Sequence, residues 1–174
     1  QGKKNGKGTL IYSSGNYFKG NFVSDKFHGD GVFCYVNEVI YEGNFIFGKP
    51  DSKVKKSYIR EFENGDRYTG DLSDSEIKGK GVYEFSNGDI YEGDFDKGSF
   101  TGWGTMVYKN GDKYEGQWLE NLRHGKGTLK FSNGKIYKGE FHKNEQTGKG
   151  SLVLQNGSQY DGVFEKGELV TRDL

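Results

Sequence analysis

A short internal repeat runs through almost the whole chain. A motif of the form aromatic-x-Gly places its glycines 23 residues apart, with one interval of 27. These glycines are Gly20, Gly43, Gly70, Gly93, Gly116, Gly139 and Gly162. A second motif, Gly-x-Gly, keeps the same step in six of the seven units. A repeat of this length is one supersecondary unit that buries its apolar face on its neighbours. We therefore expect one array of about seven units over residues 1–174.

The repeat also predicts where this array is irregular. Residues 1–17 form a partial first unit, and regular units start at residue 18. One unit contains an insert at 46–58, and residues 165–174 lack the Gly-x-Gly motif. We expect this last stretch to be an edge strand, a short helix or a frayed tail.

Each unit has the pattern of a β-hairpin. Strands are expected at 90–95 and 102–108, followed by the turn dipeptide Asn110-Gly111. Asn-Gly favours a two-residue hairpin turn because both residues tolerate positive φ. The second unit has Asn37-Glu38 instead, where glutamate should strain such a turn. The pattern predicts fourteen or fewer antiparallel strands, with no helix within residues 10–164.

Strand alternation assigns the two faces of the sheet. Tyr91, Gly93 and Phe95 share one face, whereas Glu92 and Thr105 lie on the opposite, polar face. Glycine lacks a Cβ, so it leaves room for a neighbouring ring to lie flat on the backbone. Only 32% of the residues are hydrophobic, which leaves too little for a second packed layer. The predicted fold is all-β, an elongated single-layer twisted antiparallel sheet of tandem hairpins in an open, solenoid-like array.

Composition excludes several other classes of protein. The chain has 29 glycines but one proline, which excludes collagen, and 16% aromatic residues, which excludes a disordered chain. Basic and acidic residues balance at 25 each, so no global charge attracts nucleic acid. Cys34 is the single cysteine, which excludes an intrachain disulfide and favours a reducing, cytoplasmic compartment. No apolar stretch approaches the roughly 18 residues of a membrane span.

No residue pattern indicates catalysis or a cofactor. His28 and His124 occupy the same repeat position, just before Gly-x-Gly, and repeats this far apart should not bring them together. No Ser-His-Asp constellation is evident, and Cys34 has no base nearby in the pattern. We expect a protein that is not an enzyme, with no cofactor and no metal site.

The repeated residues resemble a known family. Residues 114–136, YEGQWLENLRHGKGTLKFSNGKI, are similar to the MORN (membrane occupation and recognition nexus) repeat, and the similarity covers nearly the whole chain. The resemblance implies a single-layer antiparallel sheet without intrinsic catalysis. It also implies a scaffold and docking role, since the family occurs in membrane-junction, cytoskeletal and ciliary proteins and beside lipid kinases.

The main functional hypothesis is a docking groove on the aromatic face. A protein or peptide segment would lie along a concave groove of aromatic and glycine residues, whose rings must then be partly accessible. The predicted groove residues are Tyr68, Tyr91, Phe95, Tyr114, Trp118, Tyr137, Phe141 and Tyr160. The alternative is that these rings only stabilise the array.

The irregular unit supports a second hypothesis. Pro50, the single proline, lies in the insert and predicts a loop, and Tyr58 stands where other units have glycine. Tyr58 marks either a bend of the sheet or a ring that fills a local gap. The densest run of basic residues is also here: Lys49, Lys53, Lys55, Lys56 and Arg60. Such a run is either a patch for an anionic membrane surface or a solvated loop. A third alternative is a module that spaces or homodimerises a larger protein.

Overall fold

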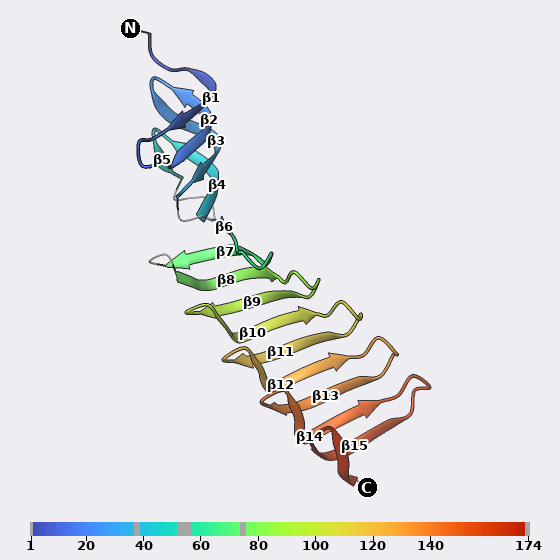
Figure 1. The fold of residues 1–174 in the computed structure, drawn as a ribbon. Coiled ribbons are helices and arrows are strands. Elements are labelled where there is room, and N and C mark those ends of the chain that lie inside the picture. The colour runs from blue at the N-terminus through green and yellow to red at the C-terminus, as the bar shows by residue number, and fades with distance from the viewer. Residues whose placement is uncertain (1, 37–38, 52–56, 74–75, 173–174) are drawn as a thin grey trace. The chain divides into compact units, whose positions relative to one another are not determined.

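The computed structural model describes residues 2–36, 39–51, 57–73 and 76–172. These residues form sixteen strands joined by turns, and none of them lies in a helix (Figure 1). The strands follow one another in chain order in an open antiparallel sheet. Two compact units are distinguished, Gln1–Leu72 and Ser73–Leu174, here called the N-terminal and C-terminal units. The expectation of one continuous array of about seven units stays a prediction.

The N-terminal unit has seven strands in its described part. They are β1 (Gly6–Ile11), β2 (Tyr17–Val23), β3 (Lys26–Cys34), β4 (Val39–Ile46), β5 (Lys49–Pro50), β6 (Ser57–Glu61) and β7 (Arg67–Ser73). Each strand pairs antiparallel with the next, except that β4 pairs with both β5 and β6.

The C-terminal unit continues the same pattern with nine strands in its described part. They are β8 (Glu76–Glu84), β9 (Ile90–Asp96), β10 (Ser99–Val107), β11 (Lys113–Leu119), β12 (Leu122–Lys130), β13 (Ile136–His142), β14 (Glu145–Val153), β15 (Gln159–Glu165) and β16 (Glu168–Arg172). Figure 1 shows β8 to β15 side by side, each lying across the unit.

The predicted limit of fourteen strands is therefore wrong. The two additional strands are β5, a two-residue strand that pairs with β4, and β16, which pairs with β15 at the edge of the sheet. Of the three alternatives for the residues after Phe164, the edge strand is confirmed.

The two ends of each described hairpin have turns of different kinds, and the prediction of a two-residue turn at Asn-Gly is wrong. At the Asn87-Gly88 turn only the glycine has positive φ, and the loop closes from Phe85 N–H to Asp89 O (2.9 Å). The two-residue turns with both φ positive lie at the opposite end, as at Lys97–Gly98 and Glu120–Asn121. An asparagine side chain stabilises the loop at Asn87-Gly88, because Asn87 Oδ1 accepts the Asp89 N–H (2.8 Å). The Asn37-Glu38 turn lies outside the described residues.

The predicted faces are confirmed by the strand register. Gly93 of β9 pairs with Gly104 of β10, and the ring of Tyr91 lies over both. A Cβ built on Gly93 would stand 2.6 Å from Tyr91 Oη, and one on Gly104 would contact the same ring even more closely. Gly102, the first glycine of the Gly-x-Gly motif, is required for a different reason. It has φ +55° where the strand register shifts.

A residue from the following strand covers these rings. We call cap positions the residues paired with the second aromatic residue of the preceding strand, and those in the described pairs are Phe27, Pro50, Phe100, Arg123, Gln146 and Leu169. Phe100 stacks on Tyr91 with ring centroids 3.8 Å apart, and Phe27 stacks on Phe18 at the same separation. Tyr91 and Phe18 are thus each held between a glycine pair and a cap.

Neighbouring hairpins are joined through the caps. Phe100 N–H donates to Asn121 Oδ1 (2.7 Å), and Asn121 N–H donates back to Phe100 O (3.1 Å). Arg123 and Asn144 repeat this reciprocal pair one hairpin later. Asn121 and Asn144 adopt positive φ, which asparagine tolerates better than most residues. The two-residue turn of one hairpin therefore fixes the cap of the hairpin before it.

The irregular unit differs from its sequence prediction at Pro50. Pro50 is in strand β5 and pairs with Phe45, so it occupies a regular cap position rather than a loop. The extra residues come after it, in a stretch that is mostly outside the described residues. Tyr58 pairs with Gly70, as expected for a glycine position, and its ring lies 5.7 Å from that of Tyr41. Of the two alternatives for Tyr58, the packing agrees with a ring that fills a local gap.

Candidate functional site

Most of the aromatic residues predicted to line the groove are buried. Tyr68, Tyr91, Tyr114 and Tyr137 have no exposed surface, and Phe95, Trp118 and Phe141 are almost fully covered. Tyr160 alone among the eight is half-buried. The expectation that these rings are accessible is therefore wrong for seven of the eight residues. Whether a partner binds on this face stays a prediction.

The reason for this burial is local packing within each hairpin. Tyr91 has Gly93 and Gly104 beneath it and Phe100 above it, and its edges meet Phe95 and Trp118 in T-shaped contacts. The aromatic contacts of Tyr91 are thus made within the sheet itself. Such pairs add about 0.5–1.5 kcal/mol each beyond the area they bury.

The tyrosine hydroxyls are also used inside the sheet. Tyr91 Oη donates to Asp94 O (3.0 Å), Tyr114 Oη to Gln117 O (2.9 Å) and Tyr137 Oη to Glu140 O (3.1 Å). Burial raises the pKa of Tyr137 to about 12, and it also raises the pKa of Tyr91 and Tyr114. These hydroxyls stay protonated at neutral pH and are structural.

An open trough nevertheless lies on the aromatic face of the C-terminal unit. It has a volume of about 530 Å³. Its lining side chains are Tyr83, Phe85, Phe100, Met106, Tyr108, Trp118, Asn121, Arg123 and Asn144. Trp118 is the one predicted groove residue among them. We call this site the trough.

Sequence reasoning missed the other trough residues although a signal was present. Phe85 and Tyr108 occupy one repeat position, just after the second strand of a hairpin, and both are half-buried. This column of aromatic residues keeps the period of the array: Tyr12, Tyr35, Phe62, Phe85, Tyr108 and Phe131. A search for every aromatic column at 23-residue spacing would have found it.

Arg123 introduces a charge into the trough. Its guanidinium carbon lies 5.7 Å from the ring centroid of Tyr114 and 5.6 Å from that of Phe141. Arg123 Nη2 donates to Asn144 O (2.9 Å), and Nε reaches Asn144 Oδ1 at 3.4 Å. The charge lowers the pKa of Asp112, although the largest cause there is the hydrogen bond from Ser132 N–H. Within the described residues, Arg123 forms no ion pair closer than 4.0 Å.

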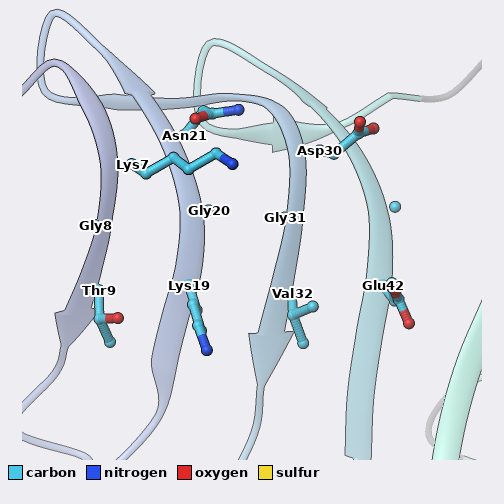
Figure 2. Close-up of a pocket in the computed structure, with 11 residues that line it drawn as sticks. Lys7, Gly8, Thr9, Lys19, Gly20, Asn21, Asp30, Gly31, Val32 and Glu42 are labelled. Carbon is cyan, nitrogen blue, oxygen red and sulfur yellow. The ribbon is translucent and has the colours of Figure 1, made fainter.

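A second groove lies on the polar face of the N-terminal unit. Figure 2 shows a row of glycines, Gly8, Gly20 and Gly31, with charged and polar side chains on either side. Lys7 and Asp30 stand at one side and Lys19 and Glu42 at the other, so both signs of charge are present. The groove has a volume of about 740 Å³. Its mixed charge and few apolar side chains favour solvent rather than an apolar segment.

The proposed anionic-lipid patch is described only in part. Lys53, Lys55 and Lys56 lie outside the described residues. Lys49 pairs with Ile46 and Arg60 with Val39, so strand alternation along β4 places the two side chains on opposite faces. The described members are not brought together, and the patch stays a prediction.

Histidines and acids do not form a metal centre in the described part of the chain. His124 lies beside His142, with ring centroids 5.2 Å apart, a neighbour that the sequence did not suggest. No group of three or more His, Cys, Asp or Glu in the described ranges is placed to hold a metal ion. Likewise, no described helix is long and apolar enough to cross a membrane.

Comparisons with known proteins agree with this architecture. The family model of the MORN repeat matches residues 1–17, 18–38, 68–90, 91–113, 114–136 and 137–159. A comparison with curated proteins finds no match. Among solved structures, the TCP domain of SAS-4 (dCPAP) in complex with a proline-rich motif of Ana2 (dSTIL), from Drosophila melanogaster, is similar in fold. It has 16% identity and a TM-score of 0.53, with 91% of this chain and 83% of that chain covered. A mutant TCP10 domain of Danio rerio CPAP has 11% identity and a TM-score of 0.31, covering 90% of this chain and 85% of that one.

Proposed function

This chain belongs to the MORN-repeat family, and we propose that it is a non-catalytic docking module that binds an extended protein segment along the trough. The observation that supports the proposal most is the trough itself, about 530 Å³ of open space beside Phe85, Tyr108 and Trp118. Apolar hollows with a few polar groups are the usual sites for binding. A long shallow site suits a linear segment better than a globular surface.

The fold comparison supports the same class of partner. The SAS-4 domain of similar fold is in complex with a proline-rich motif, which is a linear segment. For this chain we propose a protein partner within a cytoskeletal, ciliary or membrane-associated assembly, in line with the settings in which the family occurs. A second copy of the chain is the alternative occupant, and its binding would appear as a dimer in size-exclusion chromatography.

The test compares the two faces of the C-terminal unit. A phage-displayed library of random dodecapeptides is selected on the full chain, and the enriched peptides are then measured by fluorescence polarisation. Phe85→Ser with Tyr108→Ser removes half-buried trough residues and spares the buried tyrosines. Glu92→Ala with Glu115→Ala is the matched control on the polar face. Circular dichroism verifies that both variants keep their strands.

The trough pair should weaken binding at least about tenfold, whereas the glutamate pair should leave it unchanged. Loss of binding in the glutamate pair alone would show that the polar face is the docking surface. A library that yields no enriched peptide would contradict the proposal.

A further inference from the structure

The cap position of the hairpin Tyr114–Lys130 holds a cation where an aromatic ring would fit. Phe27 and Phe100 occupy the same position in other hairpins and stack at 3.8 Å. Gln146 and Leu169 also fill it, so the array does not require a charge there. Placing a half-buried guanidinium over Tyr114 costs desolvation that a phenyl ring would avoid. The charge of Arg123 therefore calls for an explanation beyond the stability of the sheet.

The hydrogen bonds of Arg123 leave donors unused. A guanidinium has five N–H groups, and Asn144 accepts from Nε and Nη2. Asp112, an acid whose pKa is lowered by the hydrogen bond from Ser132 N–H and also by the charge of Arg123, is already engaged. Its Oδ1 accepts Ser132 N–H (2.7 Å) and its Oδ2 accepts Asn110 Nδ2 (3.0 Å). Asn144 thus holds the guanidinium in place while the remaining N–H groups are available to a ligand in the trough.

The neighbouring trough residues include several aromatic rings, among them Phe85, Tyr108 and Trp118. Trp118 Nε1 donates to Gly104 O (3.2 Å), so its polar atom is used within the sheet. Phe85 and Tyr108 line the same trough and are half-buried, whereas Phe100 and Met106 are almost fully covered. The trough therefore has an apolar part next to one fixed cation.

We propose that Arg123 determines specificity by selecting partner segments with an aspartate or glutamate beside an apolar side chain. The inference rests on the proposed docking function and adds the chemistry of the partner. The carboxylate would accept hydrogen bonds from the free guanidinium N–H groups, an arrangement that is strong and directional. The apolar side chain would contact the half-buried rings of Phe85 and Tyr108.

The experiment repeats the dodecapeptide selection on four forms of the full chain. Besides the wild type, these are Arg123→Phe, Arg123→Gln and Lys126→Gln. Phenylalanine reproduces the cap of Phe27 and Phe100, so this variant should fold. Lys126→Gln removes a cation from the same strand on the polar face and is the matched control.

The wild type and Lys126→Gln should enrich peptides with an acid within three residues of an apolar side chain. Arg123→Phe and Arg123→Gln should enrich apolar peptides without this acidic excess. An enriched peptide resynthesised with glutamine for its acid should lose about tenfold in Kd on the wild type and little on Arg123→Phe.

An acidic excess that persists on Arg123→Phe, or is missing on the wild type, would overturn the role of Arg123 and leave the docking function standing. A preference for phosphoserine over glutamate at the acid position would overturn the assignment of a carboxylate. Failure to enrich any peptide on any form would overturn both proposals.

Discussion

Two hairpins, one in each unit, hold the same kind of ring under different covers. Phe18 lies over Gly20 and Gly31, and Phe27 stacks on it. Tyr114 lies over Gly116 and Gly127, and Arg123 takes the place of the stacked ring. Both rings are fully buried.

The comparison separates two tasks within one repeat. Both hairpins keep a glycine pair beneath an aromatic ring, and this arrangement fixes the fold. The cap changes from phenyl to guanidinium without exposing the ring beneath. Substitutions below the ring should therefore damage stability, whereas substitutions at the cap should alter recognition.

The largest effect is expected beneath a ring. Gly104→Val puts a branched side chain against Tyr91 and should lower the free energy of unfolding by about 3 kcal/mol. Thr105→Val, its neighbour on the polar face, should change it by less than about 0.5 kcal/mol, because Val32 and Val82 hold the same repeat position. Urea denaturation measures both. Equal midpoints would contradict the assignment of the faces.

The next largest effect is expected where one hairpin meets another. Asn121→Ala removes the hydrogen bond to Phe100 N–H and places alanine at φ +66°, so it should cost about 2 kcal/mol. Asn121→Gly keeps the favourable φ and should cost about half as much. Thermal denaturation would rank the two variants. Equal losses would show that the backbone conformation contributes nothing.

A smaller effect is expected for a ring hydroxyl. Tyr137→Phe loses the bond to Glu140 O and should cost about 1 kcal/mol at neutral pH, while the fold tolerates it as it tolerates Phe18. The folded pKa of about 12 lies above the ordinary value of 10.0, so the neutral hydroxyl favours the folded state. This contribution is complete below pH 10 and is lost as the pH rises toward 12.

Urea melts at pH 9 and pH 11.5 would test the second half of that prediction. The wild type should lose more stability than Tyr137→Phe between these two values. Parallel losses would show that Tyr137 ionises with an ordinary pKa.

The smallest effect on stability is expected at the cap. Arg123→Phe should change the free energy of unfolding by less than about 0.5 kcal/mol, since the new ring can stack as Phe27 and Phe100 do. Differential scanning calorimetry measures the change. A loss above about 2 kcal/mol would mean that the cation stabilises the sheet, and the separation of tasks would fail.

Much of the fold could be predicted because its signal is periodic. Two glycine motifs at one spacing imply hairpins, and strand alternation places Tyr91 and Gly104 on one face. The turns were assigned wrongly because Asn-Gly is a local signal that does not distinguish a two-residue turn from a longer loop with one glycine at positive φ. The tight turns include Glu120–Asn121 and Lys97–Gly98, which share no dipeptide.

The site was harder to predict because burial depends on contacts that alternation does not describe. Phe100 reaches Tyr91 only after the chain reverses at Lys97–Gly98 and the register shifts before Gly104. Without that contact, strand alternation alone predicts that Tyr91 is an accessible groove residue. Arg123 holds the equivalent position over Tyr114 in the next hairpin, so its place could not be inferred from spacing alone either.

The reciprocal bonds between Asn121 and Phe100 also have a mechanical consequence. Strands β8 to β15 lie across the C-terminal unit, so tension applied along the row of hairpins would load one strand boundary at a time (Figure 1). Each hairpin would then peel away separately, and each event would release about 23 residues, or roughly 75 Å of extended chain. A bound segment that spans several caps would oppose this peeling. The unit would then stiffen under load when its partner is in place.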